Sequence, residues 1–225
     1  MAKHDTISPS DERTVHVEAG HVTLEGTLAV PARARGVVLF AHGSGSSRFS
    51  ARNRHVAHLL REDGFATLLV DLLTPREEEI DEHTREYRFD IDRLAQRLVG
   101  ATHWLAAEQT TASLPVGLFG ASTGAGAALV AAAELPDRIA SVVSRGGRPD
   151  LAGLALPQVR AQTLLIVGGN DEPVIALNQQ ALRQLTCPAR LEIIPGATHL
   201  FEEPGALDAV AHLARRWFNQ IVEKL

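Results

Sequence analysis

The chain has 225 residues, of which 45% are hydrophobic and 22% charged, and its formal net charge is −5 at pH 7. The length suits one domain with a sizeable core, and the acidic balance argues against nucleic acid as the main partner. Cys187 is the only cysteine, which excludes an intrachain disulfide and a cysteine metal cluster. No apolar stretch is long enough for a membrane helix, and the N-terminus lacks the apolar core of a signal peptide. We therefore expect a cytoplasmic protein that does not associate with membranes.

The order of polar and apolar segments predicts the elements of the fold. Residues 1–12 are polar and are expected to be flexible, whereas residues 13–225 are expected to form one domain. The segment 13–30 alternates apolar and polar residues around Gly20, which predicts an antiparallel hairpin. Apolar runs typical of strands buried on both faces follow at 36–43, 65–72, 114–120, 138–144, 163–169 and 190–196. Helical patterns separate them at about 51–63, 87–109, 123–135, 173–186 and 205–223.

This alternation predicts an α/β fold with a mostly parallel central sheet, an N-terminal antiparallel hairpin and helices on both faces. Loops at the carboxyl ends of such strands gather at one edge of the sheet, where active sites form. The stretch 75–93 carries both signs of charge at helical spacing, and we interpret it as a solvated face leading into a helix, without a metal. Because it follows a strand, Tyr87 and Phe89 are candidates for a wall of the pocket.

The stretch GLFGASTG places Ser122 between a predicted strand and a predicted helix. A strand that turns sharply into a helix can hold its apex residue at positive φ, at a cost of about 1–3 kcal/mol for a residue other than glycine. Gly120 and Gly124 leave room for that close approach. The pattern G-x-S-x-G in this context predicts a nucleophile elbow. A purely structural glycine-rich turn is the alternative.

A serine nucleophile needs a base that accepts its proton. Two histidines follow Ser122 in the sequence. His199 lies in PGATHLFEEP, directly after the last predicted strand, whereas His212 falls inside the final predicted helix. We therefore assign His199 as the base.

The base in turn needs an acid that orients it. Asp171 lies in VGGNDEPV, just beyond a predicted strand and at the edge where active-site loops gather. Its neighbour Glu172 is the main rival, and Asp71 is a weaker one because it precedes the serine. Asp171 could instead cap the following helix. We assign Asp171 as the acid.

Two N–H groups must stabilise the oxyanion that forms during acyl transfer. One is expected from the backbone of Thr123, directly after the nucleophile. The other is expected from the loop LFAHGSGSSR, where Gly43 and Gly45 allow a close approach to a ligand, and Ser44 is our choice of donor. We interpret His42 as a structural residue that braces this loop.

The motifs GVVLFAHGSGSS, GLFGASTG, VGGNDEPV and PGATHLF occur in this order over nearly the whole chain. Together they resemble the α/β-hydrolase superfamily, and within it the small lidless dienelactone-hydrolase-like group. The resemblance implies that Ser122, Asp171 and His199 form a catalytic triad. It also implies that Ser44 and Thr123 form the oxyanion hole, and that no cofactor is needed.

One position departs from the family pattern. Dienelactone hydrolases proper carry a cysteine at the elbow, whereas this chain has Ser122, and Cys187 lies elsewhere. A serine esterase is therefore expected rather than an enzyme for dienelactone itself.

Only residues 145–162 separate two predicted strands where larger relatives insert a cap. An open, shallow site for a small-molecule ester of small to medium acyl chain follows.

The motif RGGRP at 145–149 lies at the same edge of the sheet. Arg145 or Arg148 could bind a carboxylate of the substrate. We favour the simpler interpretation, a glycine turn with solvated arginines.

The sequence thus predicts a carboxylesterase-type serine hydrolase that works through an acyl-enzyme. An acyltransferase, a thioesterase or a perhydrolase could use the same triad. A non-catalytic ligand-binding protein of the same fold is the alternative from a different class. The sequence leaves open whether the chain forms a homodimer.

Overall fold

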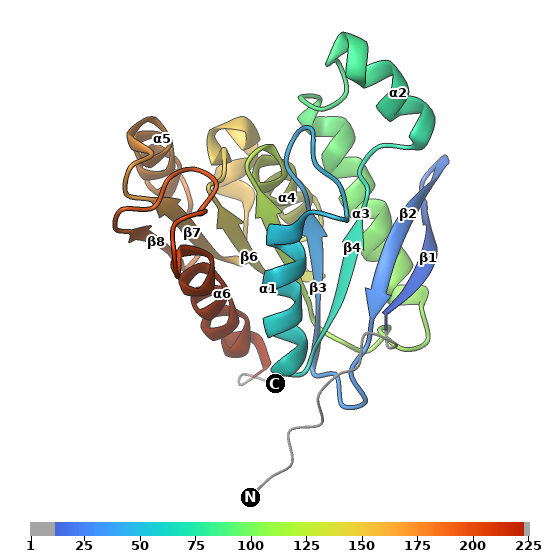
Figure 1. Ribbon diagram of the computed structural model, residues 1–225. Helices are drawn as coiled ribbons and strands as arrows, with labels where there is room; N and C mark the ends of the chain where they lie inside the picture. Colours follow the sequence, from blue (N-terminus) through green and yellow to red (C-terminus); the bar gives the residue numbers. More distant parts are fainter. Residues whose placement is uncertain (1–11, 223–225) are drawn as a thin grey trace, which may run out of the picture.

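The computed structural model describes residues 12–222, which are built around an eight-stranded sheet (Figure 1). Its strand order is β1-β2-β4-β3-β5-β6-β7-β8. β1 and β2 pair antiparallel, as do β2 and β4, and all the other neighbours pair parallel. The predicted sheet and its N-terminal hairpin are therefore confirmed. The strands are β1 (Glu12–Ala19), β2 (Val22–Ala29), β3 (Gly36–Ala41), β4 (Phe65–Val70), β5 (Val116–Ala121), β6 (Ile139–Arg145), β7 (Gln162–Gly168) and β8 (Ala189–Ile194).

Helices cover both faces of this sheet. α1 and α6 lie on one face, and α3 and α4 lie on the other (Figure 1). The helices are α1 (Ala51–Glu62), α2 (Pro75–Thr84), α3 (Ile91–Ala107), α4 (Thr123–Glu134), α5 (Glu172–Leu182) and α6 (Ala206–Val222), with a 3₁₀ segment η2 (Pro149–Gln158). Within residues 12–222, none of the helices combines the length and apolar character that crossing a bilayer requires.

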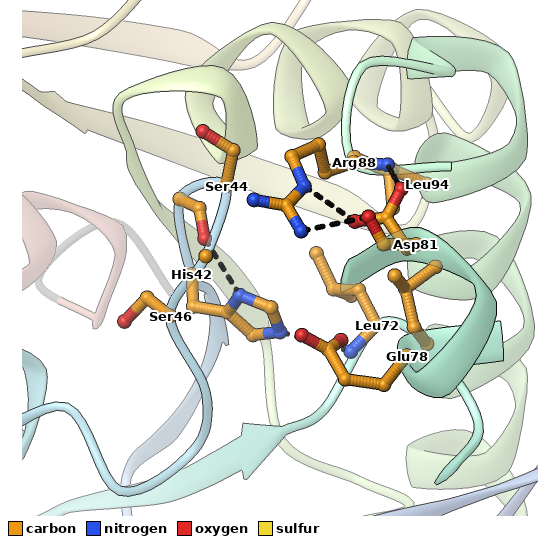
Figure 2. Close-up of a pocket in the computed structure, with 11 residues that line it drawn as sticks. His42, Ser44, Ser46, Leu72, Glu78, Asp81, Arg88 and Leu94 are labelled. Carbon is orange, nitrogen blue, oxygen red and sulfur yellow. Dashed lines mark hydrogen bonds and ion pairs between the residues drawn. The ribbon is translucent and has the colours of Figure 1, made fainter. Parts of the chain in front are cut away.

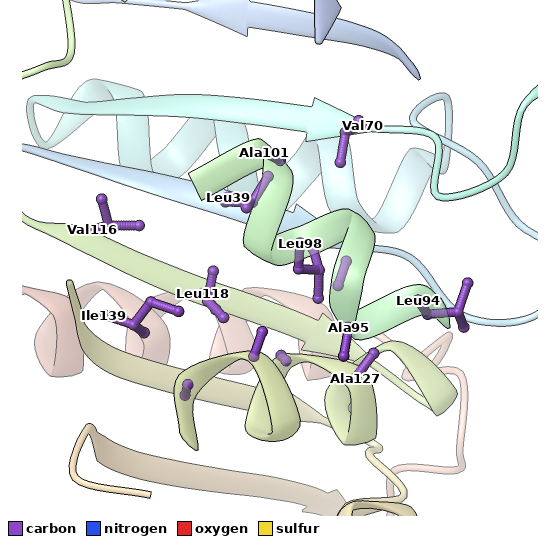
Figure 3. Packing of buried hydrophobic residues seen from close by; sticks show 14 of the residues in the cluster. Leu39, Val70, Leu94, Ala95, Leu98, Ala101, Val116, Leu118, Ala127 and Ile139 are labelled. Atoms are coloured by element: carbon purple, nitrogen blue, oxygen red, sulfur yellow. The ribbon is translucent and has the colours of Figure 1, made fainter. Parts of the chain in front are cut away.

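The central strands are apolar on both faces because each face contacts its own helices. In β3, Leu39 belongs to the hydrophobic cluster that includes Leu98 of α3 (Figure 3). The next residue, Phe40, belongs to the opposite cluster, which includes Leu60 of α1. Successive side chains of a strand point to opposite faces, so a strand between two helical layers must be apolar throughout. Packing on both faces therefore holds the central strands, and with them the loops at their carboxyl ends, in place.

The first described residue differs slightly from expectation. Glu12 was expected to end a flexible segment, but it begins β1, and its carboxylate lies 2.8 Å from the Arg61 guanidinium. The rest of that expected segment, residues 1–11, lies outside the described residues.

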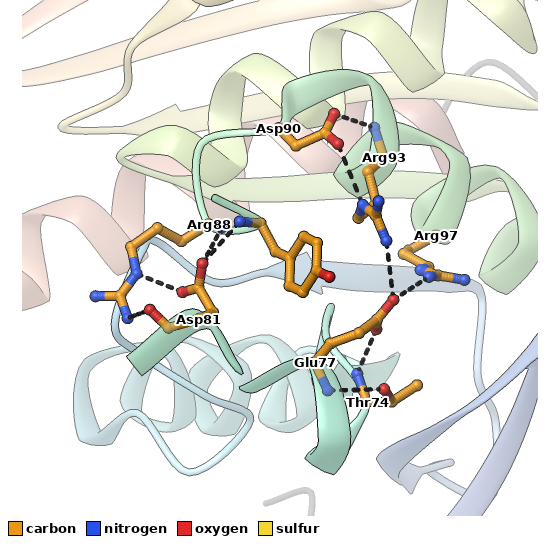
Figure 4. A network of polar contacts seen from close by, with 8 residues as sticks. Thr74, Glu77, Asp81, Arg88, Asp90, Arg93 and Arg97 are labelled. Carbon is orange, nitrogen blue, oxygen red and sulfur yellow. Dashed lines mark hydrogen bonds and ion pairs between the residues drawn. The ribbon is translucent and has the colours of Figure 1, made fainter. Parts of the chain in front are cut away.

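The charged stretch 75–93 contains a helix of its own, α2, that the charge pattern does not distinguish from the lead into the next helix. α2 begins with a capping box between Thr74 and Glu77, and its C-cap residue, Arg85, adopts positive φ. Glu77 accepts hydrogen bonds from Arg93 (3.1 Å) and Arg97 (2.7 Å) of α3 (Figure 4). The interpretation of this stretch as a solvated face is wrong in part, because these charges join α2 to α3.

Candidate active site

Ser122 stands at the turn between β5 and α4 with φ 50° and ψ −122°. Positive φ in a serine is a strained conformation that the surrounding structure must hold. The neighbouring glycines permit it: a Cβ at Gly120 would lie 2.4 Å from the Ala125 Cα, and one at Gly124 would lie 2.5 Å from the Ala41 carbonyl oxygen. The backbone of the GASTG turn therefore has the predicted elbow geometry, and any larger residue at either glycine would disrupt it.

Asp171 and His199 meet across loops that follow different strands. Asp171 follows β7 and stands at the N-cap position of α5, but its side chain makes no capping hydrogen bond. Its Oδ2 instead lies 2.6 Å from Nδ1 of His199, which follows β8. A hydrogen bond from Nδ1 to the carboxylate leaves Nε2 of the imidazole as the proton acceptor. The rival Glu172 is exposed, and His212 is exposed on α6.

Ser122 and His199 line the same cavity, which has a volume of about 240 Å³. Gly43, from the loop after β3, approaches Ser122 so closely that a Cβ there would lie 3.1 Å from the Ser122 Cβ. Gly146, directly after β6, lies near the histidine: a Cβ there would be 3.5 Å from Cε1 of His199. Loops after β3, β5, β6 and β8 thus converge on one space, as expected at the carboxyl edge of a parallel sheet.

The two residues expected to supply the oxyanion donors, Ser44 and Thr123, are in contact. The Ser44 backbone N–H donates a hydrogen bond to the Thr123 Oγ1 at 2.9 Å. Thr123 is buried at the first position of α4, where backbone N–H groups lack partners within the helix. The side chain of Thr123 therefore ties the loop after β3 to the start of α4. This contact could not be predicted, since nothing in the sequence reveals the distance between the two segments.

The loop after β3 is held by a buried histidine, His42 (Figure 2), and by an ion pair between Arg48 and Asp71. His42 donates from Nδ1 to the Gly43 carbonyl (2.9 Å), and its Nε2 accepts from the Leu72 N–H (3.0 Å). Burial lowers the pKa of His42, which favours this neutral form. Arg48 forms an ion pair with Asp71 and donates its backbone N–H to that carboxylate. His42 therefore braces the loop, and Asp71 is occupied away from His199.

The three residues suggested for substrate binding lie in different surroundings. Arg145 lines the Ser122 cavity and is only 7% exposed, so the expectation of a solvated arginine is wrong. The physical reason is that β6 continues through Arg145, one residue further than predicted, and pairs it with Ala121. Arg148 instead forms an ion pair with Asp150 at 2.7 Å. The Arg93 guanidinium lies over the ring of Tyr87, with its Cζ 4.4 Å from the ring centroid. Neither Tyr87 nor Arg148 lines the Ser122 cavity.

Comparison with known proteins places these features in a family. A solved dienelactone hydrolase from Anabaena variabilis ATCC 29413 is 64% identical, with a TM-score of 0.92 over 93% of this chain and 97% of its own. Est1E from Butyrivibrio proteoclasticus is 14% identical, with a TM-score of 0.76 over 92% of this chain and 98% of its own, which shows the fold alone.

Two curated relatives from Mycobacterium tuberculosis, strains CDC 1551 and H37Rv, are provisionally named phosphoribosyl transferases. Each is 59% identical over 210 residues, which cover 93% of this chain and 46% of the relative. The chain thus spans about half the length of the curated relatives it matches, and their name describes the longer proteins. The family model for dienelactone hydrolases matches residues 24–225. With an α/β-hydrolase fold and a match over nearly its whole length, the chain belongs to the dienelactone hydrolase family.

Proposed function

We propose that the chain is a serine hydrolase that cleaves carboxylic esters of small to medium acyl chain through an acyl-enzyme. One observation carries the proposal: a serine at a strained turn shares a cavity with a histidine whose Nδ1 lies 2.6 Å from a carboxylate oxygen. This combination supplies a nucleophile, a base and an orienting acid, which is the set that serine acyl transfer needs.

In the proposed first step, Nε2 of His199 takes the hydroxyl proton as Ser122 Oγ attacks the ester carbonyl carbon. Asp171 keeps the imidazole oriented and stabilises its positive charge. The tetrahedral intermediate collapses when His199 returns the proton to the leaving alcohol, which breaks the ester C–O bond. A water molecule then repeats the sequence on the acyl-enzyme, releasing the acid and restoring Ser122.

Oxyanion stabilisation is assigned to the backbone N–H groups of Thr123 and Ser44. The Ser44 N–H has an acceptor in the free protein, the Thr123 Oγ1. The developing oxyanion would compete for this donor, because a charged oxygen is the stronger hydrogen-bond acceptor. The threonine hydroxyl thus keeps the amide directed toward the start of α4 before the substrate arrives.

The size of the proposed substrate follows from the loops around the cavity. Between β6 and β7 the chain forms only the 3₁₀ segment η2, without a cap. The cavity beside Ser122 measures about 240 Å³, which is below the usual range of about 300–1,000 Å³ for small-molecule sites. Short esters therefore suit the site better than long-chain lipids.

Labelling with a fluorophosphonate probe tests the proposal. The wild-type chain should be modified on Ser122, and a folded Ser122→Ala variant should not be labelled. Absence of labelling in folded wild-type protein would favour a non-catalytic binding role for this cavity.

A further inference from the structure

The cavity beside Ser122 has a positively charged wall. Two of its lining residues are arginines, Arg52 from α1 and Arg145 from the end of β6, and none of its lining residues carries a carboxylate. Among residues 12–222, the one carboxylate that the Arg52 guanidinium meets is that of Glu202, at 3.3 Å, and that glutamate side chain is 66% exposed. The cavity wall therefore carries two guanidinium groups, and only that of Arg52 has a carboxylate partner among the described residues.

Arg145 is the more informative of the two arginines because it is buried without an anion. Its side chain contacts the Asn53 Oδ1 at 3.5 Å and the face of Phe201, 5.9 Å from the ring centroid. Its Nε is buried and has no hydrogen-bond partner among the described residues. Burial, together with the nearby Arg52, lowers the pKa of Arg145 to about 10, so the group is still charged at neutral pH. A buried cation without an anion is costly to a fold.

Among the described residues, one other arginine is buried, and that arginine is paired with a carboxylate. Arg61 is 9% exposed, close to the 7% of Arg145. Its guanidinium meets the carboxylate of Glu12 at 2.8 Å. The contrast indicates that the partner of Arg145 is not part of the described chain.

The N-terminus of α1 adds to the positive field in the same cavity. Ser50, the N-cap residue, and Asn53, in the first turn, both line it. The first turn of this helix contains no acidic residue. Helix N-termini attract anions through their free N–H groups and the helix dipole. This end of α1 and the two arginines therefore favour the same kind of ligand.

We propose that Arg145, Arg52 and the first turn of α1 bind an anionic oxygen group, a carboxylate or a phosphate, carried by the ester that Ser122 cleaves. The inference rests on the proposed hydrolase function and adds a substrate class to it. Arginine is suited to this task because its planar fork pairs with two oxygen atoms of a carboxylate or phosphate.

A matched pair of substrates tests the carboxylate form of the proposal. p-Nitrophenyl butyrate and mono-p-nitrophenyl succinate have acyl chains of equal length, and only the second carries a carboxylate. The wild type should show the higher kcat/KM for the succinate. Arg52→Gln and Arg145→Gln should each lower the succinate-to-butyrate ratio by about tenfold to a hundredfold, the value of a hydrogen bond to a charged group. Arg145→Lys should keep part of the ratio, and Arg54→Gln, on an exposed side chain of the same helix, should keep all of it.

A second pair distinguishes phosphate from carboxylate. Acetate esters of glycerol and of glycerol phosphate differ only in the phosphate group. Preference for the phosphorylated ester, lost in Arg52→Gln, would assign the site to phosphate. Equal turnover within both pairs, with ratios that the arginine variants do not change, would overturn the proposal and make Arg145 a structural residue.

Binding to Ser122→Ala separates this proposal from the proposed hydrolysis. Thermal shift at constant ionic strength with monomethyl succinate or inorganic phosphate needs no turnover. Stabilisation that disappears in Ser122→Ala/Arg52→Gln would support the anion site even if the wild type failed to hydrolyse any ester. No stabilisation by either anion, in a protein that hydrolyses the neutral esters, would refute the anion site and leave the hydrolase proposal standing.

Discussion

Two neighbouring regions at the carboxyl edge of the sheet differ in how their arginines are paired. Between α2 and α3, Arg97 meets Glu77 and Arg88 meets Asp81 (Figure 4). In the Ser122 cavity, Arg145 forms no ion pair within the described chain. Paired charges hold a segment in place, whereas an unpaired buried charge lowers stability unless a ligand supplies its partner. The difference separates a region whose charges are paired within the chain from the cavity that we propose to bind and cleave an anionic ester.

The comparison predicts that substitutions in the cavity change rates, and the largest change is expected at His199. His199→Ala should lower kcat on p-nitrophenyl acetate by roughly 10⁴- to 10⁶-fold, because Ser122 loses its base. Urea unfolding should show little loss of stability. His212→Ala, on an exposed residue of α6, is the control and should keep its activity. Turnover near the wild-type value would remove His199 from the mechanism.

Asp171→Asn should have the next largest effect on turnover. The asparagine keeps the shape of the side chain but no longer stabilises the imidazolium, and kcat should fall by about 10³- to 10⁴-fold. Glu172→Gln, at the exposed neighbouring position, serves as the matched control. If Glu172→Gln reduced kcat more than Asp171→Asn, the two acids would have to exchange roles.

A smaller effect is expected when the tie between the Ser44 amide and α4 is removed. Thr123→Val deletes the hydroxyl that accepts the Ser44 N–H and should lower kcat by roughly tenfold to a hundredfold, with little change in KM. Thr123→Ser should restore most of the rate, which a loss of packing alone would not explain. An unchanged kcat in Thr123→Val would show that the Ser44 amide is positioned without this contact.

The smallest effect is expected for the ion pairs between α2 and α3, where a substitution should change stability and not activity. Burial raises the pKa of Glu77, but the Thr74 N–H and Arg97 outweigh burial and leave that pKa below its ordinary value. A lowered native pKa stabilises the fold above the ordinary carboxyl pKa, and this contribution is lost as the pH falls through the native pKa. Glu77→Gln should therefore reduce the free energy of unfolding by about 1–2 kcal/mol at pH 7 and by less in acid. The control is Glu79→Gln on an exposed residue, and esterase activity should be unaffected in both.

Much of the fold could be predicted because local patterns determine it. Continuous apolar runs identify strands such as β3, which must contact helices on both faces. The elbow could be predicted because its glycines are required by the close contacts of Gly120 and Gly124. α2 was missed because its charges resemble a solvated surface, although Thr74 and Glu77 at capping-box spacing were an available signal.

The parts that could not be predicted depend on distances between segments far apart in the sequence. Whether Arg145 meets a carboxylate depends on what α1 places beside β6, and the motif RGGRP contains no information about that. The same holds for the contact between Ser44 and Thr123, which lie 79 residues apart. For Asp171, the sequence left both helix capping and histidine binding open, and the structure shows the contact to His199 without a capping hydrogen bond.

The most direct test of the central claim is to trap the covalent intermediate. The wild type is mixed with p-nitrophenyl acetate, quenched in acid within the first turnovers and digested for mass spectrometry. We expect the acetyl group on the peptide that contains Ser122, formed in step with the burst of p-nitrophenol. Release of p-nitrophenol at the full rate with no acetyl group on Ser122, or with the group on another residue, would contradict the account.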